Sequence, residues 1–94
     1  MQTFIIGYDI SGNRARRRAM KALEAYGTRV QRSVFEIHVR GEAQLRDLLA
    51  RLREELAEEE GADLRAWRLT EEGRRQSATL SGEPLSPLPA VIIL

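Results

Sequence analysis

The sequence has no cysteine and a single histidine, His38, in 94 residues. Disulfide bonds and thiolate metal sites are therefore excluded, and one chain cannot form a histidine-rich metal centre. No apolar run approaches the length of a membrane span, and no signal-peptide pattern opens the chain. Internal repeats and low-complexity tracts are also lacking. These absences predict a soluble cytoplasmic protein with no membrane partner.

The length predicts one domain, residues 1–94, with a modest core to which oligomerisation would add buried surface. Fifteen Lys and Arg against fourteen Asp and Glu give a net charge of +1, which says little. The distribution is more informative, because residues 14–32 are basic with Glu24 as their sole acid, whereas residues 54–60 carry five glutamates and no base. A basic segment of this kind predicts a polyanionic partner.

The stretch from Thr3 to Asp9 has the short apolar run of a buried strand and ends in a carboxylate. A Ser-Gly-Asn turn signal and a basic helix follow it directly. A carboxylate at the end of a central strand is held rigidly and still faces solvent, which suits a metal ligand or a catalytic acid. The alternative is that Asp9 only caps the next helix.

Residues 14–26 are predicted to be helical, with Ser11 or Asn13 as the N-cap and Gly27 in a left-handed position at the end. Its buried stripe is expected to hold Ala15, Ala19, Met20, Leu23 and Tyr26. Basic residues at a helix N-terminus oppose the helix dipole. Four arginines nevertheless stand there, which favours phosphate binding over a merely solvated face; they are Arg14, Arg16, Arg17 and Arg18.

Residues 28–39 alternate like a half-buried strand, but Val30 and Phe35 have opposite parity. A bulge or tight break near Arg32 and Ser33 is therefore predicted, giving two short strands. His38 is interpreted as an exposed or edge histidine rather than a catalytic base.

The clearest helix is Glu42–Glu59, with one leucine-rich face and Gly61 as its stop. Its glutamate-rich end is interpreted as a solvated terminus rather than a metal site. Leu64–Leu69 is predicted to be a strand in which Trp67 serves the core or an interface rather than stacking on bases.

Residues 70–88 are polar and rich in Gly, Ser and Pro, with a candidate short strand at Gln76–Leu80. The apolar residues 90–94 are expected to pair with a sheet edge, and the proline-containing linker before them favours the edge of a second subunit. The segment 70–94 is thus predicted to be a C-terminal extension that packs on a dimer partner.

Strand, helix, two strands, helix and strand make the α+β, ferredoxin-like βαββαβ pattern, here with an extra C-terminal strand. Right-handed crossovers would place both helices on one face of the sheet. A sheet-to-sheet homodimer would cover the other face.

The motif Tyr8-Asp9-Ile10-Ser11, the arginine-rich helix and the stretch Tyr26–Glu36 together resemble a known family. It is the small CRISPR-associated protein of the adaptation module, the partner of the CRISPR integrase, often named a CRISPR-associated endoribonuclease. The resemblance covers the first 36 residues motif by motif, and the remainder agrees in element order.

The resemblance implies a homodimer with a Mg²⁺ site at the dyad, for which Asp9 is the metal ligand and catalytic residue. Family positions for nuclease activity or nucleic-acid contact correspond to Tyr8, Arg16, Arg18, Arg29, Ser33 and Phe35. Together with the basic run, the candidate nucleic-acid-binding residues are Arg14, Arg16, Arg17, Arg18, Arg29 and Arg32, supported by Tyr8, Ser33 and Phe35. The family usually has an acid soon after the Ser or Thr, whereas Gly12 and Asn13 stand here.

Two functions follow. The first is a CRISPR adaptation protein that binds duplex DNA as a dimeric scaffold, with Mg²⁺-dependent cleavage of single-stranded RNA or duplex DNA. The second is a metal-dependent endoribonuclease of antiviral defence. One carboxylate per chain is few for phosphodiester hydrolysis, although two copies of Asp9 across a two-fold axis could share one Mg²⁺. A purely structural dimer or a small-molecule regulator would leave the arginine run without a use.

Overall fold

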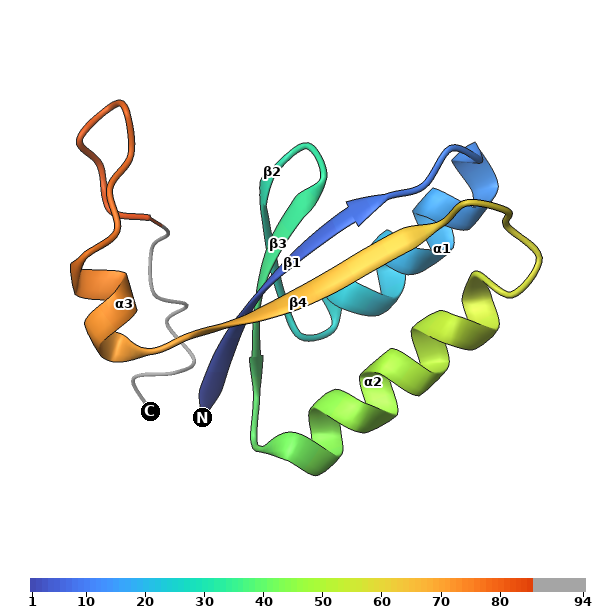
Figure 1. Ribbon diagram of the computed structural model, residues 1–94, viewed down its shortest axis with the longest axis horizontal. Helices are drawn as coiled ribbons and strands as arrows, with labels where there is room; N and C mark the ends of the chain where they lie inside the picture. Colours follow the sequence, from blue (N-terminus) through green and yellow to red (C-terminus); the bar gives the residue numbers. More distant parts are fainter. Residues whose placement is uncertain (86–94) are drawn as a thin grey trace.

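The computed structural model describes residues 1–85. It contains β1 (Gln2–Asp9), α1 (Asn13–Glu24), β2 (Gly27–Gln31), β3 (Val34–Val39), α2 (Glu42–Glu55), β4 (Asp63–Leu69) and α3 (Glu71–Arg75) (Figure 1). The strands form one antiparallel sheet in the order β2-β3-β1-β4. This is the predicted ferredoxin-like α+β fold, and it makes β1 an inner strand. Residues 90–94, the predicted extra strand, lie outside the described residues.

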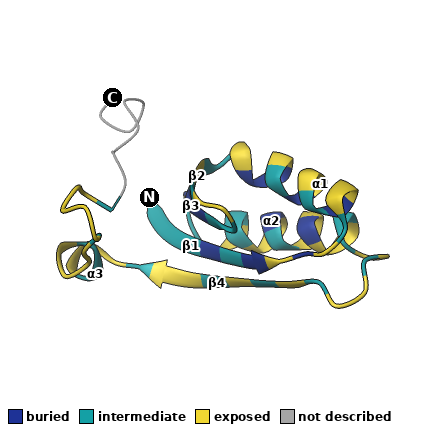
Figure 2. Ribbon diagram, turned by 90° about the horizontal axis from the view of Figure 1, so that it is seen from above, coloured by how far each residue is buried: buried dark blue, intermediate teal, exposed yellow. Residues whose placement is uncertain are grey.

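The core lies between the sheet and the two long helices, which cover the same face of the sheet (Figure 2). β1 contributes Ile6 and β3 contributes Phe35 and Ile37, all without solvent exposure. α1 contributes a row of small residues and one leucine, namely Ala15, Ala19, Ala22 and Leu23. α2 contributes Leu48 and Leu52. Alanines on α1 allow that helix to lie close to the sheet, while Arg14 and Arg17 remain exposed.

The opposite side of the sheet, called the open face below, carries the alternate residues of the strands. Ile5 of β1 stands opposite Trp67 of β4, and Gly7 lies beneath the Trp67 ring, since a Cβ there would be 3.0 Å from Cζ3. Trp67 is 54% exposed, so it is not a core residue. The other role predicted for Trp67, a place in an interface, agrees with this exposure.

One end of the open face is covered by α3. Arg74 of α3 pairs with the buried Glu36 of β3 at 3.0 Å. His38 Nε2 lies 3.6 Å from the same carboxylate, and His38 Nδ1 shares a hydrogen bond of 3.0 Å with Thr3 Oγ1. The expectation of an exposed or edge histidine is therefore wrong, because β3 is an inner strand and α3 packs over its polar side. The predicted strand at Gln76–Leu80 is also wrong, as the helix α3 precedes a stretch without strand structure there.

The break predicted near Arg32 and Ser33 is confirmed, with a turn at these residues and a register shift between Arg29 and Gln31. The role predicted for Gly27 is wrong. This glycine begins β2 without a positive φ, and it permits close approach to β3, since a Cβ would lie 1.9 Å from the carbonyl oxygen of Glu36. The turn brings Ser33 to the end of β1, where its carbonyl oxygen accepts from the Tyr8 amide at 3.1 Å.

The second long helix ends earlier than predicted, at Glu55, with Leu56 as its C-cap. Gly61, the expected stop, has φ 73° but lies in the connection to β4. Residues 56–62 therefore form an irregular link that passes near the start of α1. No helix in residues 1–85 is long and apolar enough to span a membrane.

Candidate nucleic-acid and metal site

The end of β1 opens into a pocket of about 320 Å³. Its lining comes from β1, α1, β2 and the β2–β3 turn, and consists of Asp9, Ile10, Arg16, Met20, Arg29, Arg32 and Ser33. Five of these residues are candidates from the sequence: Asp9, Arg16, Arg29, Arg32 and Ser33. The fold thus gathers three guanidinium groups and one hydroxyl around one carboxylate. Such a pocket is suited to a phosphate group, which bonds well to arginine.

Arg16 is fixed against the segment that follows Asp9. Its Nη1 donates to the carbonyl oxygen of Ile10 at 3.1 Å, and its Nη2 donates to Oδ1 of Asn13. The side chain of Asn13 is therefore not a helix cap, and Ser11 is not one either. The N-cap is Gly12, which has no side chain to accept a hydrogen bond. The predicted caps are wrong because Asn13 begins the helix and bonds to Arg16 one turn later.

Tyr8 supports the pocket from within the core. Its hydroxyl donates to the carbonyl oxygen of Arg32 at 3.1 Å, and its amide donates to the carbonyl oxygen of Ser33 at 3.1 Å. Its ring packs on Phe35 with 6.2 Å between ring centroids. Burial raises the pKa of Tyr8, although Arg29 and Arg16 oppose this effect. The phenol therefore stays protonated at neutral pH and keeps the β2–β3 turn next to Asp9.

Phe35 has no solvent exposure, so it does not touch nucleic acid. Any effect of Phe35 on the pocket must therefore pass through its contact with the Tyr8 ring. The two aromatic rings join the core to the wall of the pocket.

The other predicted arginines lie outside the pocket. Arg14 and Arg17 are exposed on the outer surface of α1, where Lys21 continues the same row. Arg18 is also exposed, but its Nε lies 3.2 Å from Oε2 of Glu55 on α2. Arg14 and Arg17 therefore differ from Arg18, whose guanidinium already has an acidic partner.

One residue near the pocket was not predicted from the sequence. Glu59, in the link between α2 and β4, accepts a hydrogen bond from the Gly12 amide at 2.7 Å. The sequence shows only a run of glutamates there, and nothing local distinguishes Glu59 from Glu58 or Glu60. The contact joins residues 47 positions apart, so only the folded chain reveals it.

A metal ion would find few ligands in one copy of this site. Within residues 1–85 there is no group of three or more His, Cys, Asp or Glu side chains that could hold a metal. Asp9 supplies the single carboxylate among the lining residues, and three arginines line the same pocket. Mg²⁺ prefers several oxygen ligands. The described residues of one chain therefore do not by themselves fit the ion.

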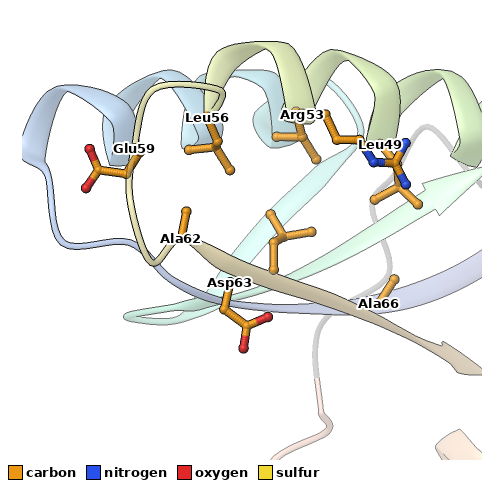
Figure 3. A pocket seen from close by; sticks show the side chains of 9 residues that line it. Leu49, Arg53, Leu56, Glu59, Ala62, Asp63 and Ala66 are labelled. Carbon is orange, nitrogen blue, oxygen red and sulfur yellow. The ribbon is translucent and has the colours of Figure 1, made fainter.

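A larger pocket of about 550 Å³ lies between α2 and β4 (Figure 3). Leu49, Leu52 and Leu56 face Leu64 and Ala66 across it. It shares no lining residue with the Asp9 pocket, and its walls are mainly leucine and alanine. These features mark a gap between a helix and an edge strand rather than a site for phosphate chemistry.

Comparison with known proteins places these features in one family. The family model described as CRISPR associated protein Cas2 matches residues 1–77. The CRISPR-associated endoribonuclease Cas2 1 of Chloroflexus aurantiacus is 41% identical over 83 residues, which cover 86% of each chain.

Solved structures agree with this result. A chain of a partial Cas6-RT-Cas1–Cas2 complex superposes with a TM-score of 0.81 and 27% identity, over 94% of this chain and 100% of that chain. Streptococcus pyogenes Cas2 superposes with a TM-score of 0.71 and 28% identity, over 83% of this chain and 98% of that chain. The fold, the extent of the matches and the family model lead to one conclusion: the chain belongs to the Cas2 family of CRISPR-associated proteins.

Proposed function

We propose that this protein acts in CRISPR adaptation in the cytoplasm, where it binds duplex DNA as a homodimer beside the CRISPR integrase. The observation that carries the proposal is the row of exposed cations on α1, formed by Arg14, Arg17 and Lys21. These side chains can neutralise backbone phosphates but read no base edges, so binding without sequence preference is expected. The similarity to a chain from a complex that contains Cas1 supports the integrase as a partner.

The homodimer is supported by the open face. Ile5 and Trp67 lie there as neighbours across β1 and β4, and the exposed indole would be covered by a second subunit. β4 is also an edge strand, whose free backbone groups could pair with residues 90–94 of the partner. A dimer of this kind doubles the arginine surface and gives a duplex two symmetric contacts.

A second function, Mg²⁺-dependent cleavage of a phosphodiester, is supported by the Asp9 pocket. Arg16, Arg29 and Arg32 can hold the nonbridging oxygens of a phosphate and stabilise the charge that develops on them. In a dimer, Asp9 and its copy would together supply the carboxylates for a cation. Mg²⁺, when bound, supplies an activated water and a positive charge at the phosphate. The name of the Chloroflexus relative, an endoribonuclease, supports RNA as the substrate class.

One set of measurements tests both functions. Wild type and Asp9→Ala are incubated with single-stranded RNA and with duplex DNA, each with Mg²⁺ and with a chelator, and binding of the same duplex is measured separately. We expect the variant to lose cleavage and to keep most of its duplex affinity, because the exposed α1 cations do not line the Asp9 pocket and remain intact.

Equal cleavage by Asp9→Ala and wild type in Mg²⁺ would contradict the cleavage proposal. Failure of the wild type to bind duplex DNA at low salt would contradict the scaffold proposal. Loss of spacer acquisition in an Asp9→Ala variant that is folded and still binds DNA would show that cleavage belongs to the biological role.

A further inference from the structure

Glu59 makes a contact that ties two distant parts of the chain together beside the Asp9 pocket. Its Oε2 accepts from the Gly12 amide at 2.7 Å. Glu59 belongs to the link after α2, and Gly12 is the residue immediately before α1. Figure 3 shows Glu59 at one end of the α2–β4 groove, with its carboxylate pointing away from the groove leucines. Glu59 thus lines one end of this pocket, and its carboxylate is directed toward the start of α1.

The start of α1 has a specific need for this carboxylate. The helix has neither a side-chain cap nor an acid in its first turn. It has Arg14 and Arg16 there instead, which add positive charge to the positive end of the helix dipole. A carboxylate that accepts from the Gly12 amide satisfies one of the free amides at this helix start and supplies the missing negative charge.

Gly12 is matched to the same carboxylate. Its φ of −73° and ψ of 130° are ordinary for any residue, so backbone freedom does not require glycine here. A Cβ at this position would lie 2.5 Å from Oε1 of Glu59 and 2.8 Å from Oε2. Glycine therefore leaves room for a side chain that arrives from the α2–β4 link.

The contact acts on the pocket through the short segment between Asp9 and Arg16. The Gly12 carbonyl oxygen accepts from the Arg16 amide at 2.9 Å, and the Ile10 carbonyl oxygen accepts from the Arg16 guanidinium at 3.1 Å. A displacement of Gly12 would thus move Arg16 relative to Asp9. We propose that Glu59 is a positioning residue, which holds the start of α1 so that Asp9 and Arg16 face the same phosphate. This inference rests on the proposed cleavage at the Asp9 pocket.

The test compares Glu59→Ala, Glu59→Gln and the control Glu58→Ala, which removes an exposed carboxylate from the same link. Cleavage of a single-stranded RNA oligonucleotide in Mg²⁺ gives kcat and KM, and amide hydrogen exchange gives the protection of Gly12. For Glu59→Ala we expect kcat to fall about tenfold with KM unchanged, in the range found for residues that orient ligands. Gln keeps an acceptor oxygen, so Glu59→Gln should restore kcat to within about twofold of wild type and keep Gly12 protected. Glu58→Ala should match wild type.

A second variant approaches the contact from the other side. Gly12→Ala places a methyl group where the Glu59 carboxylate lies, so it should reproduce the loss caused by Glu59→Ala. The double variant should lose no more than either single variant, since both remove one interaction. Additive losses would overturn the inference, as would a Glu59→Ala variant with wild-type kcat and unchanged Gly12 exchange. A Glu59→Gln variant whose kcat is as low as that of Glu59→Ala would also overturn the inference.

Failure of the proposed cleavage gives a different result. If the wild type cleaves no faster than Asp9→Ala, the cleavage proposal fails, and amide exchange alone then decides the role of Glu59. Faster exchange at Gly12 and Arg16 in Glu59→Ala would still support positioning of this segment, whereas unchanged exchange would overturn it.

Discussion

Removing two arginines from the outer surface of α1 should flatten the salt dependence of duplex binding. The perturbation is Arg14→Ala with Arg17→Ala. Both side chains are exposed and stand three residues apart on one face of the helix. Neither lines the Asp9 pocket, so the change leaves the candidate cleavage residues in place. Arg18 is kept, because it already pairs with Glu55 at 3.2 Å and should contribute less to phosphate binding.

The magnitude follows from counterion release. Each phosphate contact with duplex DNA contributes about 0.9 to the slope of log K against log salt. Two arginines in each of two protomers remove up to four contacts, so the slope should become shallower by up to about 3.6. Between about 50 and 200 mM salt, the wild type should then lose affinity about 10²-fold more than the variant.

The assay is fluorescence anisotropy of a labelled duplex across a salt series. The matched control is Arg46→Ala with Arg51→Ala, which removes the same charge from exposed positions on α2. If α1 carries the phosphate contacts, the control keeps the wild-type slope. Equal slopes for the wild type and the α1 variant would refute the reasoning, and equal flattening by both variants would show that only net charge matters.

Three further predictions concern the core, the pocket and the dimer. Phe35→Ala should lower the free energy of unfolding by about 3–5 kcal/mol in chemical denaturation, because it opens a cavity in the core. The control Leu80→Ala should lower it by less than about 0.5 kcal/mol, since Leu80 is 107% exposed. The raised pKa of Tyr8 means that the folded state favours the neutral phenol. The contribution of this phenol to stability is complete below the ordinary tyrosine pKa near 10 and is lost as the pH rises through the raised pKa. Between about pH 8 and about pH 11, the urea midpoint of unfolding should therefore fall less for Tyr8→Phe than for wild type. An equal fall in both proteins would contradict the raised pKa of Tyr8. Deletion of residues 90–94 should give monomer or aggregate in light scattering, and an intact dimer of unchanged stability would refute strand addition to the partner.

Short-range patterns predicted the elements well where the signal was hydrophobic periodicity. The apolar run before Asp9 became β1, and the leucine repeat became α2. The parity of Val30 and Phe35 predicted the break at Arg32 and Ser33, since a continuous strand would have exposed one of them. Such patterns succeed because burial of one face depends on neighbouring residues in the same element.

Predictions about individual polar residues and glycines failed where a distant segment mattered. Gly27 was expected to end a helix, yet the carbonyl oxygen of Glu36 explains its presence. His38 was expected to be exposed or at an edge, yet β3 is an inner strand and Arg74 from α3 pairs with the neighbouring Glu36. Local preference for turns, caps or exposure does not include these long-range partners.

The order of elements, their apolar faces and the concentration of arginine after Asp9 can all be predicted from the amino-acid sequence. These properties depend on the spacing of residues within short stretches, which does not change when the chain folds. The folded chain is required to show that Arg29 and Arg32 line one pocket with Arg16 and Asp9, and that Glu59 contacts Gly12. The pairing register of β2, the turn after it and the path of the α2–β4 link fix those positions. Each results from packing between segments far apart in the chain, so no local pattern encodes it.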